Sequence, residues 1–222
     1  MSNPCASALE LLGLLVGMVA WFCSLATTLM PQWLSTSTEL LVIESYELGL
    51  WETCVVQEVA GTECRAYETL LGLPFNILLS RAFMCVSDAT GLLGLLVVIP
   101  GLKQVKCCAG HQGWRVKRGV KITAGVICIV AGVTGLIPVS YIAHETVVRF
   151  FDETLPHIVP RWEFGDALFI GWAAGFLHIV AAFLYFASCL RSAGHEPRLV
   201  YHHGQDELEP VKSSSSKLTE YV

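Results

Sequence analysis

Four long apolar runs constrain the fold of this chain more than any other feature of its sequence. They cover residues 8–30, 77–102, 120–143 and 165–190. A transmembrane α-helix needs about 20 apolar residues to cross about 30 Å of hydrocarbon, and the chain is 54% hydrophobic and only 15% charged. The sequence therefore predicts a membrane protein with four transmembrane helices. The first run is too long for the apolar region of a signal peptide, so we expect it to be retained.

The basic residues predict how the helices are oriented. Residues 103–119 contain no acid and five bases, which are Lys103, Lys106, Arg115, Lys117 and Arg118. Because positively charged loops stay cytoplasmic, this segment is expected inside, together with both termini. The predicted segments are a short cytoplasmic N-terminus (1–7), helix one (8–30), the first extracellular loop (31–76), helix two (77–102), a basic cytoplasmic loop (103–119), helix three (120–143), the second extracellular loop (144–164), helix four (165–190) and a disordered cytoplasmic tail (191–222).

This topology sorts the nine cysteines by compartment. Only Cys54 and Cys64 fall outside, where stable disulfides form. They are ten residues apart, and closing such a loop stabilises a fold by about 2 to 3 kcal/mol. We therefore predict a disulfide between them. Three cysteines next to the cytoplasmic helix ends are candidates for palmitoylation instead, namely Cys107, Cys108 and Cys189.

The first extracellular loop shows the alternation of β-strands. The residue types alternate in "LWETCVV" and "ECRAY", and residues two apart lie on the same face of a strand. The predicted cystine would tie these two strands together.

The sequence contains no pattern that indicates catalysis. None of the seven histidines has the spacing of a zinc site, and no glycine-rich phosphate loop follows a strand. We predict a protein that is not an enzyme and that has no cofactor, no metal and no nucleic-acid partner. Asp88 and His178 lie within predicted helices, where we expect them to form hydrogen bonds between helices that small residues bring close.

One set of residues resembles a known family. Trp33, the Gly49-Leu50-Trp51 triplet, the two cysteines of the first loop and Arg81 form the signature of the claudins and their relatives. The segments "SRAFM", "IPVSYIAH" and "PRWEFGDALFIGW" are also similar to claudin segments, so the resemblance covers nearly the whole chain. The tryptophans suit either the membrane interface or local packing.

The resemblance implies a fold and a function. The fold would be membrane α+β, a left-handed bundle of four transmembrane helices that carries a small extracellular antiparallel β-sheet formed by both loops. The function would be to polymerise with other claudins, in cis and in trans, into the barrier of the epithelial tight junction in the plasma membrane. The alternative is an auxiliary-subunit or adhesion protein of the wider superfamily with the same signature.

The resemblance also implies roles for single residues. The residue after the second loop cysteine would face the ion path, and here it is Arg65, with Glu63 on the same strand face. Because more distant acids are screened beyond about 8 Å, we expect a cation barrier or weak anion path. Leu70 would meet Phe150 and Phe151 of a neighbouring copy. Two terminal residues, Tyr221 and Val222, would bind PDZ scaffold proteins of the junction.

Overall fold

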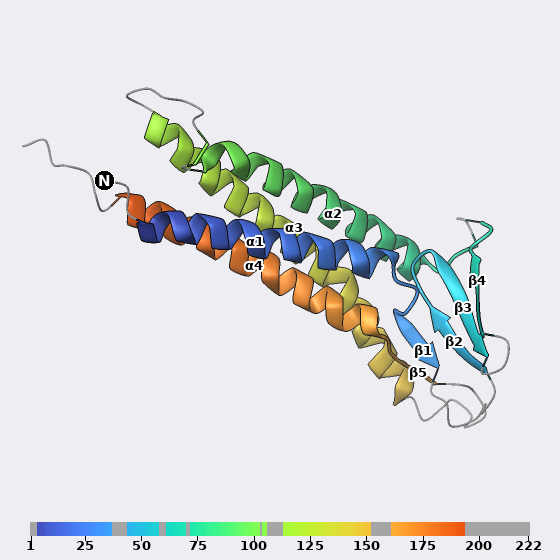
Figure 1. Cartoon of the computed structure of the whole chain (residues 1–222). Helices are drawn as coiled ribbons and strands as arrows, with labels where there is room; N and C mark the ends of the chain where they lie inside the picture. Colours follow the sequence, from blue (N-terminus) through green and yellow to red (C-terminus); the bar gives the residue numbers. More distant parts are fainter. Residues whose placement is uncertain are drawn as a thin grey trace, which may run out of the picture.

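The computed structural model describes residues 4–36, 44–57, 61–69, 72–102, 104–105, 113–151 and 161–193 (Figure 1). Its helices are α1 (Pro4–Leu29), α2 (Phe75–Gly101), α3 (Gly113–Phe150) and α4 (Asp166–Ala193). Each of the four is long and apolar enough to cross a membrane. The chain is a multi-pass membrane protein, as the apolar runs predict.

Helix α3 is longer than its apolar run. It has 38 residues and continues to Phe150, through the first residues of the predicted second loop (144–164). Hydropathy marks only the part of a helix that crosses lipid, and residues 144–150 contain no glycine or proline that would end the helix. The first residues of the predicted second loop are therefore helical, and the last turns of α3 stand beside the sheet (Figure 1).

Small residues set the spacing of the bundle. A Cβ atom on Gly132 of α3 would lie 2.8 Å from the carbonyl oxygen of Gly175 of α4. A Cβ atom on Gly125 would lie 2.7 Å from the ring of Phe186. The prediction that glycines allow close helix packing is confirmed at these positions.

A five-stranded sheet stands at one end of the bundle (Figure 1). Its strands are β1 (Leu34–Thr36), β2 (Glu44–Leu48), β3 (Glu52–Gln57), β4 (Gly61–Ala66) and β5 (Trp162–Phe164). The order is β4-β3-β2-β1-β5, and every neighbouring pair is antiparallel. Because β5 follows α3 and the other strands follow α1, both loops build the sheet, as expected.

An apolar cluster joins the sheet to the helices. Its buried members come from the loop (Trp33, Leu50) and from three helices, including Met84 of α2, Val139 of α3 and Leu168 of α4. Burial of these large side chains fixes where the sheet stands on the bundle.

Candidate functional site

The two tryptophans of the signature hold the loop to the end of α1. Trp33 is 2% exposed, and its Nε1 donates a hydrogen bond to the Thr27 carbonyl oxygen at 2.8 Å. Trp51 is 40% exposed, and its Nε1 donates to the carbonyl oxygen of Thr28 at 2.8 Å. These carbonyls lie in the last turn of the helix, where no intrahelical donor reaches them. Trp33 is thus a packed core residue and not a member of a lipid-facing aromatic belt.

Gly49 permits a close crossing of two chain segments. A Cβ atom at this position would lie 2.5 Å from the Cα atom of Pro31. Its backbone N–H donates to the Glu52 carbonyl oxygen at 3.0 Å, which closes the turn between β2 and β3. Any side chain here would push the loop away from α1.

Arg81 joins α2 to this turn. The side chain is 6% exposed, and its Nε donates to the carbonyl oxygen of Leu50 at 2.5 Å. Its guanidinium lies 4.9 Å from the ring centroid of Trp51 and 5.3 Å from that of Tyr67. Cation–π contacts of this kind are stronger when they are desolvated. We call Trp33, Gly49, Leu50, Trp51 and Arg81 the signature hub.

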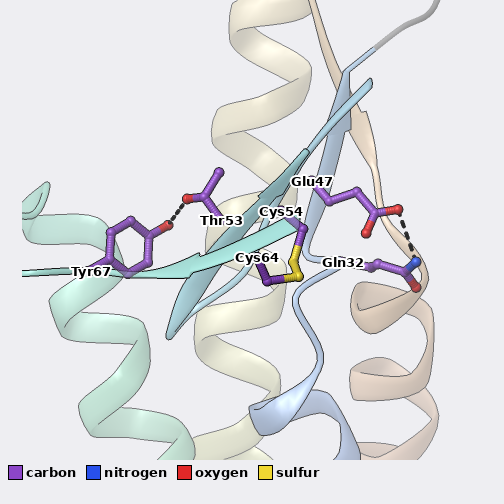
Figure 2. Close-up of a disulfide and its surroundings, with 6 residues drawn as sticks. All are labelled: Gln32, Glu47, Thr53, Cys54, Cys64 and Tyr67. Atoms are coloured by element: carbon purple, nitrogen blue, oxygen red, sulfur yellow. Dashed lines mark hydrogen bonds between the residues drawn. A yellow bond between two sulfur atoms is a disulfide. The ribbon is translucent and has the colours of Figure 1, made fainter. Parts of the chain in front are cut away.

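Tyr67 connects the signature hub to strand β3. Its hydroxyl donates to the Gly49 carbonyl oxygen at 3.1 Å and accepts a hydrogen bond from Thr53 Oγ1 at 3.0 Å (Figure 2). Nothing in its sequence position marked Tyr67 as a functional residue. Only the fold brings it beside Arg81.

The predicted disulfide is confirmed. Cys54 of β3 and Cys64 of β4 are direct partners in the antiparallel register and are bonded through their sulfurs (Figure 2). The bridge ties the edge strand β4 to the sheet interior. These two residues and Glu52 also form the one group of potential metal ligands close enough together in the described part of the chain, but sulfurs bonded to each other are not available as thiolates.

The register sorts the charges of the sheet onto two faces. Partners across the sheet share a face, and one row holds Arg65, Thr53, Leu48, Leu34 and Phe164. The adjacent row, on the opposite face, holds Cys64, Cys54, Glu47, Ser35 and Glu163. Two acids of the sheet are thus separated from Arg65 by the sheet itself.

Arg65 and Glu63 are both exposed on β4 and share a face, as predicted. No ion pair joins them in the part of the chain that the structure describes. The charge of Arg65 is therefore not cancelled by a direct contact with its neighbour.

Phe150 and Phe151 lie at the end of α3 in edge-to-face contact, with ring centroids 5.4 Å apart. Phe151 is 73% exposed. The two rings border a cavity of about 230 Å³ that also touches Trp162 and Phe164. Leu70, their predicted partner in a neighbouring copy, lies outside the described residues.

Several other predicted residues are also outside the described part of the chain, namely Cys107, Cys108, Tyr221 and Val222. Cys189 is described, and its side chain is 3% exposed. Its Sγ lies 3.9 Å from the carbonyl oxygen of Arg118 on α3. In this position the thiol is packed between helices and does not face lipid or water.

A buried ion pair was missed by the sequence interpretation. Lys121 Nζ of α3 lies 2.7 Å from Glu10 Oε1 of α1, and the two side chains are 4% and 2% exposed. The signal was a single acid in the first apolar run and a single base in the third. Ionisable residues inside a bundle usually pair with each other, so this coincidence predicts a contact.

The expected polar contacts within the membrane are confirmed for Asp88. Its carboxylate accepts hydrogen bonds from Ser24 Oγ at 2.6 Å and from Thr28 Oγ1 at 2.7 Å, which link α2 to α1. His178 instead contacts the Ala174 carbonyl oxygen of its own helix through Nδ1, at 3.0 Å.

Comparisons with known proteins agree with these features. A sequence profile described as the PMP-22/EMP/MP20/Claudin family matches residues 7–185. Claudin-7 of Mus musculus is 34% identical over 219 residues, which is 97% of this chain and 99% of that protein. Claudin-17 of Sus scrofa is 34% identical over 184 residues (82% and 80%), and Claudin-9 of Homo sapiens is 35% identical over 172 residues (76% and 77%).

The family match, the similarity to claudins over almost the full length, the signature hub and the confirmed cystine lead to one conclusion. The chain belongs to the PMP-22/EMP/MP20/Claudin family and, within it, to the claudins.

Proposed function

We propose that this protein is a structural, non-enzymatic claudin of the epithelial tight junction that restricts the passage of cations between cells. Its sheet would stand in the extracellular space, with the N-terminus and tail in the cytoplasm. The observation that carries the proposal is the position of Arg65, exposed on the edge strand β4 and on the face away from Glu47 and Glu163.

Distance and geometry support a role for this charge. At physiological salt, charges separated by more than about 8 Å are largely screened, so the charge on the path wall acts more strongly than the net charge of the loop. The guanidinium stays protonated at any working pH. Glu63 opposes it on the same face, so we expect a cation barrier and no strong anion preference.

The rigid attachment of the sheet also supports a wall-forming role. The signature hub fixes the turn between β2 and β3 to α1 and α2, and the cystine fixes β4 to β3. A charge can select ions only when the backbone that carries it keeps its place.

Assembly of the protein into junctional strands would use the end of α3. Phe151 is exposed beside the cavity of about 230 Å³, which has the apolar lining needed to receive a side chain such as Leu70 from a neighbouring copy. The partners would be other claudins, in cis and in trans, and PDZ scaffold proteins that bind Tyr221 and Val222.

Expression of the protein in a low-resistance epithelial layer tests the proposal. We expect junctional localisation, continuous strands in freeze-fracture images, a higher transepithelial resistance and a dilution potential that shows reduced permeability of sodium relative to chloride. Strands with an unchanged or raised sodium preference would contradict the cation barrier. Absence from cell contacts would favour the auxiliary-subunit alternative.

A further inference from the structure

A second cavity lies between the sheet and the ends of α2 and α3 and shares Thr146, Phe150 and Trp162 with the cavity beside Phe151. Its volume is about 360 Å³, which is within the range of about 300 to 1,000 Å³ for ligand sites in proteins. Leu34 and Leu48 of the sheet, Ile77 of α2 and Ile142 of α3 form apolar parts of its wall. The cavity is thus lined both by the sheet and by helices α2 and α3.

One cation at this cavity has no partner among the residues that the structure describes. The Arg149 guanidinium belongs to the lining and is exposed, and no hydrogen bond or ion pair joins it to another residue that the structure describes. The other charged groups of the lining are already engaged. Arg161 donates to the Phe150 carbonyl oxygen, and the Glu145 carboxylate accepts a hydrogen bond from Asn76 at 2.5 Å.

The cavity adjoins the surface that faces lipid. Phe75 is 70% exposed at the start of α2, two residues before Ile77 of the lining. Helix α2 crosses the membrane, so an apolar side chain that is exposed at its end contacts lipid tails or the interface. The apolar lining at Ile77 is therefore close to a surface that lipid covers.

We propose that this cavity binds one acyl chain of an anionic lipid from the membrane leaflet next to the sheet. The chain would occupy the apolar space between Leu34, Ile77 and Ile142, and the anionic head would pair with Arg149. Carboxylate, sulfate and phosphate heads all match a guanidinium with two parallel hydrogen bonds. Bound lipid would fill the space under the sheet and stabilise its position on the helices.

Photolabelling of the purified full-length protein tests the proposal. The probe is palmitic acid with a diazirine in its chain, and the methyl ester of the same probe is the uncharged comparison. We expect labelled peptides that contain Ile77 or Ile142, and about fivefold more label from the acid than from the ester, as a single exposed charge pair allows. Excess unlabelled palmitic acid should remove this label.

Two pairs of variants assign the site. Ile77→Trp fills the cavity and should lose most of the label, whereas Leu78→Trp, whose side chain is 42% exposed on the next position of α2, should keep it. Arg149→Gln should lower the amount of label from the acid to the amount obtained with the ester. Arg149→Lys should retain the difference between acid and ester.

The proposal is overturned if label appears only on exposed lipid-facing residues, or if Ile77→Trp labels as the unaltered protein does. Equal labelling by acid and ester in the unaltered protein overturns the role of Arg149. Should Ile77→Trp fail to fold, the competition by unlabelled palmitic acid in the unaltered protein decides the outcome, because labelling that survives the excess acid is nonspecific.

Discussion

At the scale of single residues, the family signature is explained by polar contacts that join the first loop to the helices. Trp33 and Trp51 bind the last carbonyls of α1, and Arg81 binds Leu50 and stacks on Trp51 and Tyr67. Each side chain offers a donor and an apolar face together, which few residue types can provide. The signature residues therefore form the joint that holds the first loop on the helices, and they need not touch an ion or a partner.

Arg81 gives the sharpest test of this joint. Arg81→Ala removes a hydrogen bond from a charged donor and two cation–π contacts, and we expect a loss of about 2 to 4 kcal/mol. Arg81→Lys keeps the charge without the planar fork and should recover only part of it. Thermal unfolding in detergent measures both, with the exposed Arg115→Ala as control. An unfolding temperature of Arg81→Ala equal to that of the control would show that the joint does not depend on this residue.

At the scale of elements, the sequence predicts what depends on periodicity and misses what depends on tertiary contacts. The four helices and the strands β3 and β4 follow from apolar runs and alternation. The three-residue strands β1 and β5 are too short to have a pattern of their own, and they form only because β1 pairs with β2 and β5 pairs with β1. The same holds for Tyr67 and Lys121, whose partners are distant in the sequence.

The ion pair between α1 and α3 makes a prediction at this scale. Glu10→Gln leaves Lys121 buried without its counter-ion and should cost about 3 to 5 kcal/mol. The double change Glu10→Met with Lys121→Met removes both charges and should restore most of the stability, because a buried pair contributes little over apolar packing. Unfolding in detergent compares them. A double variant that is no more stable than Glu10→Gln would mean that the pair has a further role.

At the scale of the whole molecule, a rigid sheet stands on a membrane-spanning bundle. The helices have extensive packing of their own, whereas the sheet has a small core and depends on the signature hub and the cystine. Loss of one tie should therefore affect the sheet before the bundle. This division fits a protein whose helices anchor it and whose sheet meets its surroundings.

The cystine tests this division. Cys54→Ser with Cys64→Ser should leave the helices inserted but remove about 2 to 5 kcal/mol from the sheet, so that proteolysis of the loop becomes faster. Helix content by circular dichroism and the rate of limited proteolysis separate the two effects. Cys85→Ser, at an exposed free cysteine, is the control. Equal proteolysis of the control and the double variant would contradict the account.

The most direct test of the proposed function is the dilution potential of Arg65→Glu in a low-resistance epithelial layer. The change replaces one positive charge by one negative charge at an exposed position of β4 that is proposed to meet ions, so we expect the ratio of sodium to chloride permeability to rise roughly fivefold. Glu63→Gln, on the same face, should lower it, and Glu163→Gln, on the opposite face of the sheet, should leave it unchanged. An unchanged ratio in Arg65→Glu, with normal junctional strands, would contradict a barrier that selects ions through this residue.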